Sequence, residues 1–179
     1  MARALAPGYG SMRPMVFRLA PMSGLIFGMT CALFLVPIGF LAAPLFDPRL
    51  SPLALIGGVI ALSYAFIWLY MRPTAFEITR EGLDVVWPLR RRHIPRSDIL
   101  GATEVRPPDL RAEFGTLLRV GVGGLWGGFG LAWSSRGEHL GLYVSRHADG
   151  FVLVRCRGTR SLLITPERPD AFVAALPSA

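Results

Sequence analysis

The sequence contains no lysine, and two long stretches contain no charged residue of either sign. The first stretch runs from Leu19 to Phe46 and the second from Leu50 to Met71. Charged residues make up only 17% of the chain and hydrophobic residues make up 52%, whereas an average soluble protein is about a quarter charged. This distribution argues against an ordinary soluble domain at the N-terminal end, because core helices rarely run so far without a charged position.

Each uncharged stretch is long enough to cross a bilayer, which requires about 20 apolar residues. As a helix, Leu50–Met71 would reach roughly 33 Å. A cleaved signal peptide explains the first stretch less well, because its hydrophobic region would span only about 7–15 residues and no second apolar run would follow it. We therefore expect a transmembrane helical hairpin over residues 19–71, with spans at about 22–46 and 51–71.

Arginines determine the expected orientation of this hairpin. Arg3, Arg13 and Arg18 precede the first span without any acidic residue, and further arginines begin directly after the second span at Arg72. The connection Asp47-Pro48-Arg49 carries one charge of each sign. The positive-inside rule then places both termini in the cytoplasm. Residues 1–18 should form an irregular basic tail near the anionic headgroups.

Small residues recur every four positions in both expected spans. This spacing puts them on one helix face and lets another backbone approach closely. Either the two spans pack on each other through these faces, or one face recruits a separate membrane protein. The residues concerned are Gly24, Gly28 and Ala32 in the first span and Gly57, Ala61 and Ala65 in the second.

The ends and interiors of the spans carry little polar chemistry. Trp68 and Tyr70 close the second span, where amphipathic rings prefer the membrane interface. Apart from Cys31 and the tyrosines, neither span holds an ionisable residue. Transport through this chain alone is therefore not expected, because ion and proton paths normally need such residues.

Residues 72–179 are predicted to form a water-facing domain of short strands followed by one helix. Phe76–Thr79 alternates apolar and polar residues, and a turn at Arg80-Glu81-Gly82 leads to a second strand. Thr165 is expected to cap the final helix, with Pro166 at its first position. The apolar face of that helix consists of Phe172, Val173 and Leu176.

The order of several segments resembles bacterial pleckstrin-homology (PH) domain proteins, many of which carry two N-terminal membrane helices. The segments are Phe76–Leu83, Trp87–Pro95 followed by Asp98-Ile99, Arg119 with the glycine-rich Gly121–Gly130, and Thr165–Phe172. The resemblance implies an α+β architecture, in which the transmembrane hairpin is followed by a PH-like β-barrel closed by the C-terminal helix. It also implies a bacterial cytoplasmic (inner) membrane location, and it supplies no catalytic residues.

The glycine-rich stretch 121–130 does not match a nucleotide-binding loop. A P-loop ends in Gly-Lys-Ser/Thr, and a dinucleotide fingerprint needs a downstream acid after a strand–helix turn. Two interpretations remain open. Either the stretch is a flexible connection whose aromatic side chains fill the barrel end, or Trp126 and Phe129 enter the membrane interface or contact a partner.

Arginines are densest just behind the second span, at Arg90, Arg91, Arg92 and Arg96. They either bind anionic headgroups or form the ordinary positive-inside signal. The three histidines have no companions at metal-ligand spacing, and no nucleophile, base or metal set is recognisable. We therefore expect no metal, no cofactor, no catalysis and no nucleic-acid binding.

The predicted function is that of a non-catalytic, membrane-anchored interaction module. It would act as an accessory or assembly subunit of a membrane protein complex, such as a respiratory or photosynthetic one. Its partners would be membrane lipids and other integral membrane subunits. The alternative is a PH-like sensor of anionic lipid that uses the arginine cluster.

Overall fold

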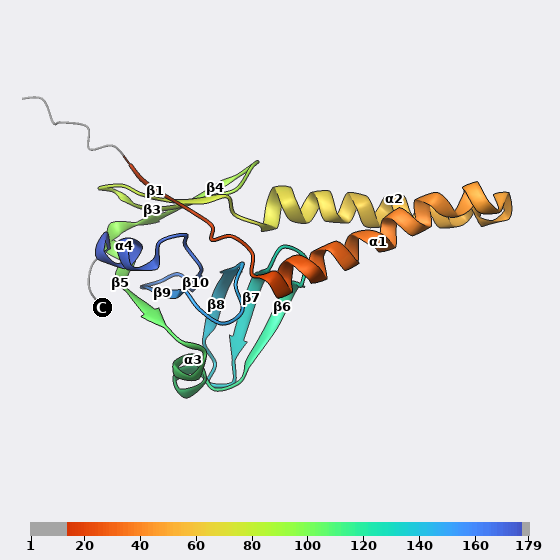
Figure 1. The fold of residues 1–179 in the computed structure, drawn as a ribbon. Helices are drawn as coiled ribbons and strands as arrows, with labels where there is room; N and C mark the ends of the chain where they lie inside the picture. The colour runs from red at the N-terminus through yellow and green to blue at the C-terminus, as the bar shows by residue number, and fades with distance from the viewer. Residues whose placement is uncertain (1–13, 177–179) are drawn as a thin grey trace, which may run out of the picture.

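The computed structural model describes residues 14–176. Two long helices project from a sheet-rich domain (Figure 1). They are α1 (Gly24–Phe46) and α2 (Ser51–Phe66), and α2 continues as the π-helical turn η2 (Ile67–Met71). The short 3-10 turn η1 (Pro48–Leu50) joins them, and the Asp47 carboxylate accepts a hydrogen bond from the Arg49 N–H at 2.9 Å. The helix α1 and the continuous helical segment Pro48–Met71, which includes α2, are each long and apolar enough to cross a membrane.

The first sheet contains four antiparallel strands in the order β1-β2-β3-β4. They are β1 (Met15–Arg18), β2 (Ala75–Ile78), β3 (Gly82–Val86) and β4 (Arg91–Pro95). β1 falls within the tail that the sequence predicted to be irregular. Phe17 explains this difference, because it is buried and its ring packs edge-to-face on Phe172 at 5.2 Å. The rest of that predicted tail, residues 1–13, lies outside the described residues.

The second sheet contains six strands in the order β5-β9-β10-β8-β7-β6. All neighbours are antiparallel except β10 and β8, which are parallel. The strands are β5 (Ile99–Val105), β6 (Leu117–Gly123), β7 (Gly128–Ser134), β8 (His139–Val144), β9 (Phe151–Cys156) and β10 (Ser161–Ile164). The 3-10 turn η3 (Arg96–Asp98) connects this sheet to the first.

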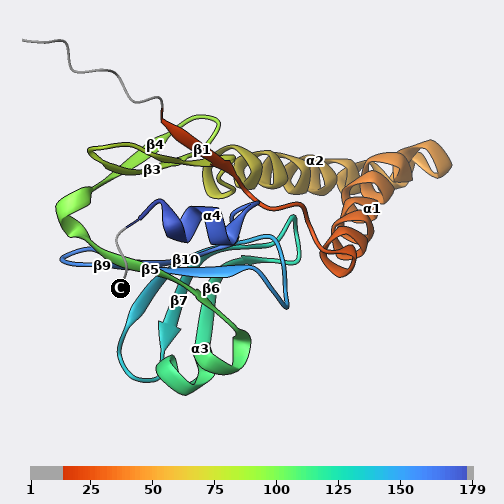
Figure 2. The ribbon, with the colours of Figure 1, turned by 60° about the vertical axis from the view of Figure 1, so that its left-hand side comes forward.

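The predicted closed barrel is not found, because both sheets are open. Within residues 14–176, no strand of one sheet is paired with a strand of the other. The helix α4 (Pro169–Ala174) lies between the two sheets instead of closing one end of a barrel (Figure 2). Its Phe172 is fully buried there. The Phe172 side chain therefore fills the space between the two sheets, which are not joined by strand pairing.

The helix α4 also begins later than predicted. Thr165 does not cap it, since the buried Thr165 hydroxyl accepts a hydrogen bond from the Ser145 N–H at 2.9 Å. Pro166 forms a bridge with Leu19, and the Glu167 N–H donates to the Arg18 carbonyl at 2.8 Å. These extended residues continue the contact with the N-terminal segment, so the helix begins at Pro169.

The domain has two apolar cores, one on each face of the six-stranded sheet. The larger core lies between the two sheets and includes α4. The smaller core lies on the opposite face and includes α3 (Pro107–Phe114), a helix that the sequence did not predict. Leu110 and Phe114 of α3 pack there with Leu142 and Leu153.

Hydrogen bonds fix both long helices to the domain. The Ser145 hydroxyl donates to the Ala20 carbonyl at 2.6 Å, just before α1, and the Ser23 N–H donates to the Ser145 carbonyl. At the end of η2, the Trp87 indole N–H donates to the Met71 carbonyl at 3.0 Å. The hairpin is therefore attached to the domain at the foot of each helix.

Candidate functional site

The β6–β7 hairpin reaches up to the two long helices, and its tip, residues 124–127, lies against them. The tip is closed by a hydrogen bond from the Gly124 N–H to the Gly127 carbonyl at 2.9 Å. Trp126 has a φ of 58° and is the only non-glycine residue with positive φ among those described. Such a conformation is strained for a bulky residue, so the surroundings of Trp126 must hold it in place.

Thr30 of α1 is the polar contact of this tip. Its hydroxyl donates to the Ile26 carbonyl at 2.8 Å and accepts the Trp126 N–H at 2.9 Å. The same oxygen lies 3.1 Å from the Gly124 carbonyl oxygen. Thr30 is buried, so its hydroxyl is the hydrogen-bond partner of a backbone N–H shielded from water. Without that partner, the buried N–H would cost about 1–3 kcal/mol.

Aromatic rings from both helices surround the Trp126 indole. Its ring centroid lies 4.9 Å from that of Trp68, 5.7 Å from Phe34 and 6.5 Å from Tyr64. All three pairs are edge-to-face, a geometry worth about 0.5–1.5 kcal/mol per pair beyond burial. The Tyr64 hydroxyl donates to the Leu33 carbonyl of α1 at 3.1 Å. Trp126 therefore lies as a wedge between the feet of α1 and α2.

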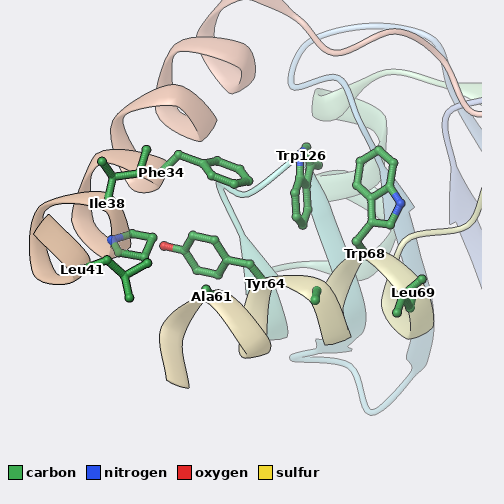
Figure 3. A pocket seen from close by; sticks show the side chains of 10 residues that line it. Phe34, Ile38, Leu41, Ala61, Tyr64, Trp68, Leu69 and Trp126 are labelled. Carbon is green, nitrogen blue, oxygen red and sulfur yellow. The ribbon is translucent and has the colours of Figure 1, made fainter. Parts of the chain in front are cut away.

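An apolar groove opens between the helices next to this wedge (Figure 3). We call it the helix groove, and it has a volume of about 440 Å³. Figure 3 shows Phe34 and Ile38 projecting from α1, Tyr64 from α2 and Trp68 from η2, with Trp126 between them. No charged residue lines it. Its lining residues are Phe34, Pro37, Ile38, Leu41, Ala61, Tyr64, Ala65, Trp68, Leu69 and Trp126.

Arg72 contacts one ring of the aromatic cluster, that of Trp68. Its guanidinium lies 4.4 Å from the Trp68 ring centroid, a cation–π contact. Burial lowers the pKa of Arg72 from its usual value, but a guanidinium stays protonated at physiological pH. Among residues 14–176, its Nε has no hydrogen-bond partner. A fixed positive charge thus marks the foot of α2, directly after its last apolar turn.

The structure separates the four arginines of the predicted cluster. Arg91 pairs with two carboxylates, at 3.0 Å from Glu77 and 3.4 Å from Asp84. Arg90 stacks on the Trp87 ring at 4.0 Å. Arg92 lines a shallow hollow together with Arg160, and Arg96 lies exposed in η3. They therefore do not converge on one ligand, and Arg91 is already neutralised by the protein.

The predicted small-residue series also divide. A Cβ on Gly57 would lie 3.0 Å from the Phe40 Cβ and 3.1 Å from the Leu41 N, so this glycine brings the two helices together. Gly24 and Gly28 have nothing within 4 Å, and Ala32 is exposed as well. The series in α2 thus contributes to hairpin packing through Gly57, whereas the series in α1 faces away from α2.

The predicted aromatic residues occupy different environments. Phe129 is 1% exposed and belongs to the core between the sheets, so its ring is not accessible to a partner. Trp126 contacts the helices of its own chain. Trp68 and Tyr70 lie in η2 and are each about two-fifths exposed, and Tyr70 stacks on Phe66 at 5.0 Å.

The sequence did not indicate Thr30, Phe34 or Tyr64 as members of a site. Their signal is weak, because Phe34 is one of many apolar residues in its helix. Thr30 and Tyr64 could have been noticed as hydrogen-bonding groups inside apolar runs, where such groups usually find a partner. Their actual partners, the tip of β6–β7 and the Leu33 carbonyl, are distant in sequence.

Comparison with known proteins identifies the domain that contains the β6–β7 hairpin. A family model described as "Bacterial PH domain" matches residues 74–179, which is more than half of the chain. The chain belongs to the bacterial PH domain family. This confirms the family predicted from the segment order. No curated protein and no solved structure gave a match. PH domains are generally non-catalytic modules that bind proteins or lipids.

Proposed function

We propose that this bacterial PH domain protein is a membrane-anchored accessory or assembly subunit whose helix groove receives a transmembrane helix of another membrane protein. The observation that carries this proposal is the helix groove itself. It is apolar, open, and lies between two helices long enough to span a bilayer. A site of this kind offers no chemistry for catalysis, but it offers a shape that the side chains of a packing helix can fill.

The exposure of the two helices supports a membrane location. Only 17% of the apolar window of α1 and 6% of that of the segment Pro48–Met71 is buried within the chain. Core helices of soluble proteins are mostly buried. Large apolar side chains such as Leu45, Phe46 and Leu55 are more than 70% exposed. Lipid or another membrane protein would remove this surface from water, a strongly favourable change of about 25 cal/mol per Å².

The two faces of the hairpin offer different contacts to a partner. On the groove side, Ala61 and Ala65 of α2 leave space beside the ring of Tyr64. On the outer side of α1, Gly24, Gly28 and Ala32 present a smooth stripe without a neighbour. Small residues permit close helix approach in lipid, where van der Waals packing drives association. The groove is the more specific of the two because its shape is fixed by Trp126.

The topology that we propose follows from the arginines. Arg72 at the foot of α2 and Arg18 before α1 lie on the domain side, and the connecting turn carries Asp47 and Arg49. The positive-inside rule then places the PH domain and both termini in the cytoplasm. A partner in this arrangement would be an integral protein of the same bacterial inner membrane, as in respiratory or photosynthetic assemblies.

Purification in mild detergent from native membranes tests the proposal. We expect at least one other membrane protein to co-purify with the full chain in a fixed ratio. Ala65→Leu should fill the helix groove and remove that protein. Ser63→Leu adds similar bulk at an exposed position that does not line the groove, so the partner should remain. If the wild-type chain elutes alone, or if both variants behave alike, the proposal fails.

A second candidate function is contact with anionic lipid at the foot of α2. The observation in its favour is the β3–β4 turn, where Trp87 is hydrogen-bonded to Met71 and Arg90 stacks on Trp87. Leu89 in the same turn is 58% exposed. An apolar residue beside an arginine suits a bilayer surface, where each basic residue contributes about 1 kcal/mol. Arg90→Glu should then weaken binding to phosphatidylglycerol-rich membranes, whereas it should leave partner co-purification unchanged.

A further inference from the structure

A second and larger groove lies on the face of the six-stranded sheet that α3 covers in part. We call it the sheet groove, and its volume is about 1000 Å³, at the upper end of the range of about 300–1,000 Å³ for small-molecule sites. The first turns of α1 form one end and α3 forms the other.

Glycines form much of the floor of the sheet groove. β6 and β7 contribute Gly121, Gly123 and Gly128, and Gly127 of the tip lies beside them. A Cβ on Gly121 would lie 2.2 Å from the Phe129 carbonyl oxygen and one on Gly127 would lie 2.1 Å from the Val144 oxygen, so their own backbones require glycine. Gly123 differs, because an added Cβ there meets nothing within 4 Å. It therefore borders the open space of the groove.

Apolar side chains supply the rest of the interior. Leu142, Val144 and Leu163 come from the sheet, and Leu110 comes from α3. At the other end, Leu25 and Met29 of α1 line the groove and are 59% and 47% exposed. The groove is thus continuous with the apolar surface of α1, so a hydrocarbon chain could pass from the helix into it without crossing water.

All charged residues that line the sheet groove are basic. Arg111, Arg119 and Arg146 line it together with His147, and no Asp or Glu does. Within residues 14–176, neither Arg111 nor Arg119 forms an ion pair. Arg146 lies 3.6 Å from Asp149, whose side chain is largely exposed. An anionic group with an apolar body would match this combination of charge and surface.

From these observations we infer that the sheet groove binds one anionic phospholipid of the surrounding membrane. Its acyl chain would lie over the glycine floor and its phosphate would be held by the arginines. A lipid fits better than an acidic protein segment, because the groove begins at the apolar turns of α1 and can be filled directly from the bilayer. This inference is independent of the partner that we propose for the helix groove.

The test uses native mass spectrometry of the full chain in mild detergent, incubated with palmitoyl-oleoyl phosphatidylglycerol or with the matching phosphatidylcholine. We expect one bound phosphatidylglycerol and much less phosphatidylcholine. Gly123→Leu should abolish the adduct by filling the groove. Arg119→Glu should weaken it about tenfold, because an attractive charge becomes a repulsive one. Arg157→Glu changes an exposed arginine outside the groove and should have no effect.

Several results would overturn the inference. One is that the chain retains phosphatidylglycerol and phosphatidylcholine equally, and that neither Gly123→Leu nor Arg119→Glu changes this. The bound lipid would then be nonspecific lipid around the two helices. Another is the absence of any phosphatidylglycerol adduct. A third is a co-purifying protein that Gly123→Leu removes, which would assign the groove to a protein segment. Arg119→Glu changes an exposed side chain, so it keeps the test valid if Gly123→Leu lowers the melting temperature.

Discussion

The helix groove and the sheet groove share α1 as a wall and approach each other at the tip of the β6–β7 hairpin, but they differ in charge. No charged residue lines the helix groove, whereas three arginines and a histidine line the sheet groove. The difference follows from position. One groove lies between apolar helices, and the other lies on the domain beyond their feet. The β6–β7 hairpin thus separates a surface suited to a transmembrane helix from one suited to an anionic amphiphile.

The largest expected effect concerns Trp126, which lines the helix groove and contacts both helices. Trp126→Ala removes the ring from its contacts with Phe34, Tyr64 and Trp68 and should lower the free energy of unfolding by about 3–5 kcal/mol. Trp126→Gly should be about 1 kcal/mol less damaging than Trp126→Ala, because glycine accepts the φ of 58° without strain. Thermal or chemical unfolding in detergent measures both. A Gly variant that is no more stable than the Ala variant would refute the strain argument.

The two glycine series provide the next contrast. Gly57→Leu should lower the free energy of unfolding by about 3 kcal/mol, because its side chain would overpack against Phe40 and the Leu41 backbone. Gly28→Leu meets no neighbour and should leave unfolding unchanged. Unfolding measurements on the two purified variants check this. Equal losses for both would mean that α1 packs through a different face from the one described.

Thr30 should give the smallest of the three effects. Thr30→Val keeps the size of the side chain but leaves the Trp126 N–H without a partner, which should cost about 1.5 kcal/mol. Thr30→Ser keeps the hydroxyl and should come close to wild type. Hydrogen exchange of the Trp126 amide gives a direct reading of the bond. Similar exchange in the Val and Ser variants would show that Thr30 does not couple α1 to the hairpin tip.

Sequence patterns predicted the helices and the family because their signals are local or repeated along the chain. The two uncharged runs end at Phe46 and Met71, where α1 and the second helical segment also end. The order of the segments between Phe76 and Phe172 indicated a PH domain. The strand β1 was missed since its partner, β2, lies nearly sixty residues further along the chain. The start of α4 was misplaced because the Thr165 hydroxyl is engaged by Ser145, a tertiary contact.

The candidate site was only partly predictable for the same reason. Trp126 stood out in a glycine-rich stretch, so its importance could be suspected. Its neighbours Thr30, Phe34 and Tyr64 lie more than sixty residues away in sequence, and no local pattern links them. The predicted arginine cluster shows the opposite case. Arg91 and Arg92 are consecutive residues of β4 and therefore face opposite sides of the sheet. Arg90 precedes that strand and Arg96 lies in η3, so all four have different surroundings.

The most direct test of the central claim is photo-crosslinking in native membranes from position 65. A diazirine-bearing aliphatic residue at Ala65 would project into the helix groove, and the same residue at Ser63 serves as the control outside it. We predict that the probe at position 65 crosslinks to an apolar segment of another membrane protein and that the probe at position 63 does not. Crosslinks from position 65 to lipid alone, or only to this chain, would contradict the assignment of the helix groove as a partner site.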